Sequence, residues 1–203
     1  MNAYQKEQLD ALRMVRKGLA QLGPATVSQL KAAAEDYLRF RRQVDTFLQT
    51  HFSAVCTHTC FQNRASACCS KDGIITFFAD TVVDALSATA SQLDALEAVL
   101  DRSNTGHRCV YLTSTGCMWT VRPVVCAMFL CDRAMQSAFG QAPAVEQEWQ
   151  RLRRQARSFK WPDRPVLFDH LEKVFLDMGL RSTLMHLNLS PGLLMVKKKA
   201  GLR

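Results

Sequence analysis

Cysteine is the residue type in this chain whose number and spacing indicate chemistry, because all eight cysteines fall in one central stretch. In chain order they are Cys56, Cys60, Cys68, Cys69, Cys109, Cys117, Cys126 and Cys131. Free cysteines also fill apolar core, but core cysteines would be scattered through the flanking apolar segments as well. Thiolate sulfur is a soft ligand, and four thiolates form a closed tetrahedral site. The clustering therefore predicts a centre that holds zinc or iron, the iron as an ion or as an iron–sulfur cluster.

Spacing indicates which of the first four cysteines can share one ion. If the helix before Cys56 continues, Cys56 and Cys60 are about 400° of rotation apart and face the same side. Cys68 and Cys69 are adjacent, so in an extended backbone their side chains point to opposite faces. We therefore expect Cys56 and Cys60 to bind one centre together, and Cys68 to be a spare beside Cys69.

The later four cysteines differ in the support that their positions give. Cys109 and Cys117 lie near the open end of a predicted β-hairpin. Cys126 and Cys131 are about 140° apart on a regular helix, so one ion reaches both only if that helix is interrupted. We therefore favour Cys126, which follows an Arg-Pro helix start, and expect Cys131 to be a second spare.

The sequence leaves the arrangement of the eight thiolates open. They are compatible with two four-coordinate sites, with one cluster and spare cysteines, or with one site and a redox pair. Buried, inert cysteines are the remaining interpretation. His58 and His107 are additional candidate ligands, because each lies two residues from a cysteine.

An ordered set of motifs adds to this interpretation. It consists of Cys68-Cys69 followed by Gly73-Ile74, then Gly116-Cys117, then Arg122-Pro123-Val124-Val125-Cys126 and a final Cys131. This set resembles the YkgJ-like cysteine-cluster family, whose members are described as zinc- or iron-chelating proteins. The family typically begins with C-x2-C-x2-C-C, whereas this chain has the longer Cys56-x3-Cys60-x7-Cys68-Cys69. The resemblance implies a metal-binding fold and supplies no substrate.

Helices are predicted over most of the chain, from apolar residues at helical spacing and from capping-box patterns. They cover residues 4–21, a helix from a capping box at Thr26–Gln29 to about Phe52, residues 82–86, residues 92–100 after a capping box at Thr89–Gln92, residues 123–140, a helix from about Pro143, and residues 165–180.

Short strands and loops complete the prediction. Residues 109–113 and 117–119 form a predicted hairpin, and residues 184–196 form a second one. Residues 74–78 are either a short strand or the start of a helix, and the segment before them is a predicted loop. The expected fold is a single, mainly α domain with one or two small β-hairpins around a cysteine-ligated metal centre. We divide it into an N-terminal helical hairpin (1–52), a cysteine core (53–140) and basic C-terminal helices and hairpin (141–203).

Charge and targeting signals limit the class of protein. The net charge of +8 arises in the last quarter, where residues 151–203 hold 12 basic and 4 acidic side chains. The N-terminus lacks a secretory signal, and no apolar run reaches the roughly 18 to 20 residues that span a bilayer. We therefore expect a soluble, cytoplasmic protein, in which an even cysteine count favours metal ligation over disulfides.

Three functional hypotheses follow. The first is a metal-binding protein whose zinc or iron–sulfur centre is structural or carries electrons. The second is an iron–sulfur oxidoreductase or modifying enzyme, although the C-x3-C-x2-C motif of radical S-adenosylmethionine enzymes and the phosphate-loop and nucleophile-elbow motifs are missing. The third is binding of nucleic acid or another polyanion by the basic C-terminal quarter. Its basic residues near Trp161 are Arg151, Arg153, Arg154, Arg157, Lys160 and Arg164, and Lys197–Lys199 follow near the end. Solvated helix charges explain the same residues without a ligand.

Overall fold

The computed structural model describes residues 3–65, 68–70, 75–140, 142–160 and 166–185. Within these ranges the chain is mainly helical with one two-stranded antiparallel sheet, which confirms the predicted fold class at that level. The elements are α1 (Ala3–Gln21), α2 (Pro24–Phe52), the π-helix η1 (Ser53–Phe61), α3 (Phe78–Ser87), α4 (Ala90–Leu100), β1 (Leu112–Thr113), β2 (Gly116–Cys117), α5 (Val124–Ala127), α6 (Asp132–Phe139), α7 (Pro143–Lys160) and α8 (Leu167–Asp177).

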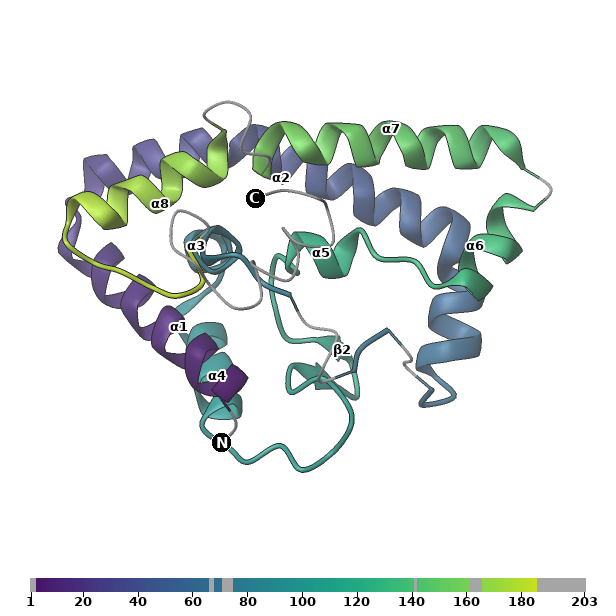
Figure 1. Cartoon of the computed structure of the whole chain (residues 1–203), viewed down its shortest axis with the longest axis horizontal. Helices are drawn as coiled ribbons and strands as arrows, with labels where there is room; N and C mark the ends of the chain where they lie inside the picture. The colour runs from purple at the N-terminus through teal and green to yellow at the C-terminus, as the bar shows by residue number, and fades with distance from the viewer. Residues whose placement is uncertain (1–2, 66–67, 71–74, 141, 161–165, 186–203) are drawn as a thin grey trace.

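The main core lies between α2, α3, α7 and α8. Figure 1 shows α7 along α2, with α8 beside them and α3 near the centre of the view. Aromatic side chains fill this core. The Tyr37 ring packs edge-on against Phe168, with 5.4 Å between the ring centroids, and Phe78 packs edge-on against Phe175, with 5.1 Å between the centroids. Buried aromatic rings contribute much of the apolar area that stabilises such a domain. Because α3 lies at the centre, α1, α2 and α8 all pack against it.

A smaller apolar cluster lies between α1, α4 and the hairpin. Leu9 and Leu12 of α1 and Leu96 of α4 are buried there together with Tyr111 and Trp119, which flank the hairpin. At the rim of this cluster, the Arg16 guanidinium bridges α1 to two carboxylates of α4, Asp94 and Glu97. The cluster therefore ties the segment that carries Cys109 and Cys117 to the N-terminal helix.

The helix starts test the capping predictions. The Thr89–Gln92 capping box is confirmed: the backbone N–H of Gln92 donates to the Thr89 hydroxyl at 3.3 Å, and the Gln92 side chain accepts from the Thr89 N–H at 2.8 Å. The Thr26–Gln29 capping box is wrong. α2 begins at Pro24, with Gly23 extended before it, because proline is favoured in the first turn, where its missing N–H costs no hydrogen bond.

The predicted helix over residues 123–140 is wrong as a single element. α5 ends at Ala127, and α6 begins at Asp132 after an extended Cys131. The carboxylate of Asp132 lies in the first turn of α6, where negative charge is favoured by the helix dipole. The helix is therefore interrupted between Cys126 and Cys131, as it must be if one ion is to reach both.

The remaining predictions differ in their outcomes. α1, α3, α4 and α7 confirm the predicted helices, and α8 is shorter than the predicted 165–180. In the segment 74–78, residues 75–77 are neither strand nor helix, and α3 begins only at Phe78. The hairpin predicted at 184–196 lies outside the described residues from 186 onward. Among the helices that the structure describes, none combines the length and the apolar character needed to cross a bilayer.

Candidate metal centre

Cys56 and Cys60 lie on a π-helix rather than on a continuation of the α-helix before them. η1 follows α2 directly, and Figure 1 shows the chain turning away from the α2 axis near this junction. A π-helix is rare and is often associated with functional sites. Its wider turn still places residues four apart near the same face, so Cys56 and Cys60 remain neighbours. Cys56 is exposed and Cys60 is half-buried.

The segment with the adjacent pair Cys68-Cys69 is joined by backbone pairing to the segment with Cys109. The N–H of Cys109 donates to the carbonyl oxygen of Cys69 at 2.7 Å, and Ser70 and Arg108 form an antiparallel bridge. The Arg108 guanidinium also donates to the carbonyl oxygen of Arg64. This pairing fixes Cys69 beside Cys109, although the two are far apart in the sequence.

Cys117 comes next to these residues through the hairpin. Cys117 on β2 pairs with Leu112 on β1, and the Met118 N–H donates to the Tyr111 carbonyl at 3.0 Å. Gly116 has a φ of +120°, a conformation that side chains with a Cβ rarely adopt. The hairpin with a cysteine near each open end is therefore confirmed, and Gly116 allows its turn.

Cys126 and Cys131 lie on the two sides of the break between α5 and α6. Cys126 is in α5, and Cys131 is the residue that precedes the first turn of α6. Both are half-buried. Phe129, which lies within this break, has a side chain that is 54% exposed.

Charge coupling links Cys56 with three other thiols. Burial raises the pKa of Cys56, and the neighbouring thiols of Cys68, Cys131 and Cys60 raise it further, while Arg122 lowers it. We call Cys56, Cys60, Cys68 and Cys131 the outer group, because Cys56 and Cys68 are exposed. Each member of this group comes from η1, from the Cys68-Cys69 segment or from the start of α6.

A second set of four thiols is coupled in the same way. A hydrogen bond from Cys68 lowers the pKa of Cys69, whereas burial and the thiols of Cys109, Cys117 and Cys126 act in the opposite direction. Burial raises the pKa of Cys109 to about 12 and that of Cys126 to about 11. We call Cys69, Cys109, Cys117 and Cys126 the inner group. The adjacent pair Cys68-Cys69 is where the two groups meet.

Backbone N–H groups hydrogen-bond three sulfurs of the inner group. The Tyr111 and Leu112 N–H groups lower the pKa of Cys109, although burial is the larger effect on this thiol and raises it. Against the same dominant effect of burial, the Trp119 N–H lowers the pKa of Cys117 and the Ile75 N–H lowers that of Cys126. Donors directed at sulfur favour the thiolate, which is the form that ligates metal. This donor set fits a thiolate-bound metal.

Two buried carboxylates, which sequence reasoning missed, hold the segment before Cys126. Asp80 accepts from the Phe77 N–H at 2.9 Å and from the Val124 N–H at 3.0 Å. One turn later, Asp84 accepts from the Val121 N–H at 2.7 Å. Burial raises the pKa of both carboxyls to about 6, against these hydrogen bonds. The signal that could have found them is two aspartates four apart within an otherwise apolar helix.

Arg41 and Arg122 supply positive charge beside the same segment. Arg41 is buried and donates to the Arg122 carbonyl at 2.6 Å and to the Tyr37 hydroxyl at 3.1 Å. The Arg122 guanidinium pairs with Asp45 at 3.1 Å and lowers the pKa of cysteines from both groups, although burial, which raises these pKa values, has a larger effect. A cation shared by both groups offsets part of the charge of several thiolates.

The candidate residues surround one region without closing on an ion. Within the described residues, no three side chains of histidine, cysteine, aspartate or glutamate lie close enough together to hold a metal. The His58 ring contacts Gln62 at 3.1 Å on the exposed face of η1. Of the predicted basic surface, Arg151 pairs with Glu148, and Lys160 is drawn toward the core, where it lies 5.4 Å from the Phe77 ring. Trp161 and Lys197–Lys199 lie outside the described residues.

Comparisons with protein-family models, with curated proteins and with solved structures found no match to this chain. The resemblance to the YkgJ-like family therefore stays a prediction.

Proposed function

We propose that the chain is a metal-binding protein with two thiolate sites, one in the outer group and one in the inner group. The observation that supports this proposal is proximity: the thiols of Cys60, Cys68 and Cys131 lie near that of Cys56, and the thiols of Cys109, Cys117 and Cys126 lie near that of Cys69. Four thiolates are the complete ligand set of a structural zinc site and of an iron–sulfur cluster. Binding requires the thiols of each group to draw closer together than they lie in this structure.

The inner group supports a structural or electron-carrying centre. Its sulfurs accept backbone N–H donors from Tyr111, Trp119 and Ile75, and the carboxylates of Asp80 and Asp84 fix the segment that leads to Cys126. Groups that orient ligands in this way often matter nearly as much as the ligands themselves. When bound, zinc would stabilise the fold here, and an iron–sulfur cluster would exchange electrons.

The outer group favours a second candidate function, an iron–sulfur enzyme. Cys56 and Cys68 are exposed, so a centre held there would be within reach of a substrate from solvent. A catalytic centre there would keep one coordination position open for substrate, with three of the four thiols as ligands. The basic C-terminal quarter as a binder of nucleic acid stays a separate prediction, because much of it lies outside the described residues.

Metal analysis of protein purified without oxygen tests the proposal. We expect two zinc ions per chain, or iron with inorganic sulfide in the ratio of two clusters. Cys56→Ser should remove the outer centre alone and Cys117→Ser the inner centre alone, since both positions are exposed and tolerate serine sterically. Ser114→Ala in the same hairpin turn is the matched control and should keep both. Protein with eight titratable thiols and neither metal would refute the proposal.

A further inference from the structure

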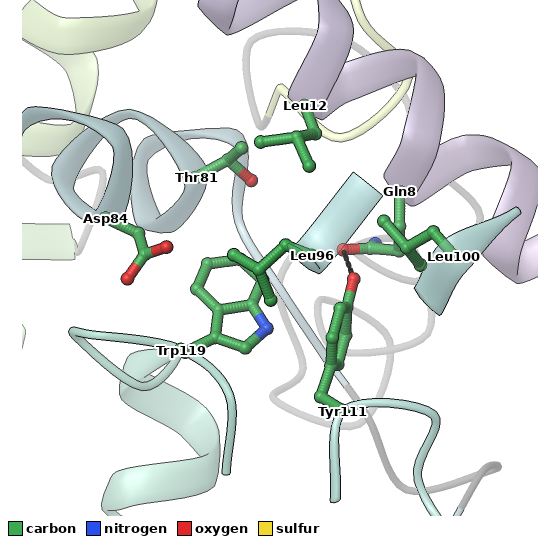
Figure 2. Close-up of a pocket in the computed structure, with 8 residues that line it drawn as sticks. All are labelled: Gln8, Leu12, Thr81, Asp84, Leu96, Leu100, Tyr111 and Trp119. Carbon is green, nitrogen blue, oxygen red and sulfur yellow. Dashed lines mark hydrogen bonds between the residues drawn. The ribbon is translucent and has the colours of Figure 1, made fainter. Parts of the chain in front are cut away.

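A small cavity lies beside the hairpin. It is bounded by Gln8 of α1, by Thr81 and Asp84 of α3, by Tyr111 and Trp119 of the hairpin flanks, and by leucines of α1 and α4 (Figure 2). The side chains of Gln8 and Tyr111 are each 2% exposed, and Trp119 is 7% exposed. The cavity therefore combines an apolar wall with several buried polar groups.

Three hydrogen-bond donors at this cavity have no acceptor among the described residues: the indole N–H of Trp119, the amide Nε2 of Gln8 and the hydroxyl of Thr81. Oδ2 of Asp84 likewise has no donor there. The Tyr111 hydroxyl donates to Oε1 of the same Gln8 amide at 3.4 Å, which leaves its own oxygen able to accept. A buried donor without an acceptor costs about 1 to 3 kcal/mol. Tryptophan in particular is normally buried with its N–H bonded.

The arrangement of these groups defines what can satisfy them. Figure 2 shows the indole nitrogen of Trp119 on the side of its ring that faces Tyr111 and Gln8, whereas Thr81 and Asp84 lie toward the other side. The Trp119 and Gln8 donors, which face each other, cannot bond each other, so they need a group that accepts from both. The same group should donate to the Tyr111 oxygen. A water molecule does all three.

The size of the cavity also favours a single water molecule as its ligand. The centre of a water-sized sphere has about 10 Å³ in which to move, which is about the least that one ordered water requires. Organic ligands are too large for this space. We infer that the cavity is a binding site for one ordered water, which accepts from Trp119 Nε1–H and Gln8 Nε2–H and donates to the Tyr111 hydroxyl oxygen.

This water has a structural consequence for the cysteines. Tyr111 and Trp119 lie on either side of the two strands, β1 and β2. Cys109 lies shortly before β1, and Cys117 lies in β2, whereas Gln8 belongs to α1. The water therefore fastens the hairpin to the N-terminal helix. The inference does not rest on the proposed metal sites, since none of its groups is a candidate ligand.

Solution NMR on the full-length 15N-labelled protein tests the site. Trp119→Phe identifies the indole signal of Trp119 among the three tryptophans. We expect this signal to show a cross-peak to a water of long residence time. Gln8→Met, which keeps length but removes the amide, should abolish the cross-peak and shift the indole proton upfield. Gln5→Met on the same helix is the matched control, because Gln5 bonds the Leu100 and Arg102 carbonyls instead; it should keep the cross-peak.

A high-resolution crystal structure of the unaltered protein provides a second measurement, which holds even if Gln8→Met does not fold. Density for a water within hydrogen-bond distance of Trp119 Nε1 and Gln8 Nε2 would support the inference. A dry cavity, an indole N–H bonded directly to protein, or a water cross-peak that persists in Gln8→Met would overturn it.

Discussion

The backbone N–H of Cys109 donates a 2.7 Å hydrogen bond to the carbonyl oxygen of Cys69. This bond joins two candidate ligands from segments that are far apart in the sequence. It is supported by the adjacent antiparallel bridge between Ser70 and Arg108. The backbone therefore brings the two cysteines together, which would lower the entropy cost of closing the inner group on the proposed metal.

Amide hydrogen exchange should report this junction. We expect the Cys109 amide to exchange slowly and the amide of exposed His107 to exchange fast, because only the first is bonded to Cys69. Loading with zinc should slow the Cys109 amide further, by about tenfold or more, since each 1.4 kcal/mol of added local stability is a factor of ten. Equal exchange with and without zinc would contradict closure of the inner group on a metal.

The clustering of the cysteines was predictable, but their grouping was not. Periodicity placed Cys56 and Cys60 on one face, and the hairpin placed Cys109 near Cys117, because both are local effects. The outer group depends on where η1 meets the start of α6, a contact between distant segments that no local pattern encodes. Cys68 and Cys131, predicted to be spares, belong to that group by their coupling with Cys56.

The helix break and the buried aspartates were missed for a related reason. Residues 123–140 are apolar at helical spacing throughout, and the restart at Asp132 is a small electrostatic preference that the pattern hides. Asp80 and Asp84 read as the polar positions of a surface helix. Only the tertiary structure shows that their partners are the backbone N–H groups of Val124 and Val121.

Asp80→Ala should destabilise the protein and weaken the inner centre. The substitution leaves the buried N–H groups of Phe77 and Val124 without an acceptor, and such losses cost about 1 to 3 kcal/mol each. We expect the free energy of unfolding to fall by about 2 to 4 kcal/mol in urea titrations. Asp94→Ala, which removes an exposed carboxylate paired with Arg16, is the control and should cost less than about 1 kcal/mol. Similar losses for both variants would argue against a structural role for Asp80.

Asp84 should make stability depend on pH between about 4 and 6. Burial raises its pKa in the folded chain to about 6, above the ordinary value of 3.8 that applies when the chain unfolds. In that interval the folded state binds more protons, so this contribution to stability decreases as pH rises. Asp84→Asn lacks the effect, and its free energy of unfolding relative to the unaltered protein should increase by about 2 kcal/mol from pH 4 to pH 7. Asp80 titrates in both proteins, and because it is coupled to Asp84 it changes the size of this difference but not its sign. A difference that stays constant with pH would refute this assignment.

Metal release to a chelator should occur in two phases. Two cysteines of the outer group, Cys56 and Cys68, are exposed. In the inner group only Cys117 is exposed, and the other three cysteines are half-buried. A chelator therefore reaches the outer centre first. The carboxylates of Asp80 and Asp84 also hold the inner ligands in place, and supports of this kind typically change metal affinity 10- to 100-fold. We expect the slow phase to be about tenfold or more slower than the fast phase in a chromogenic chelator assay. Cys56→Ser should remove the fast phase and Cys117→Ser the slow one, and a single phase that both variants reduce equally would show that the eight thiols form one centre.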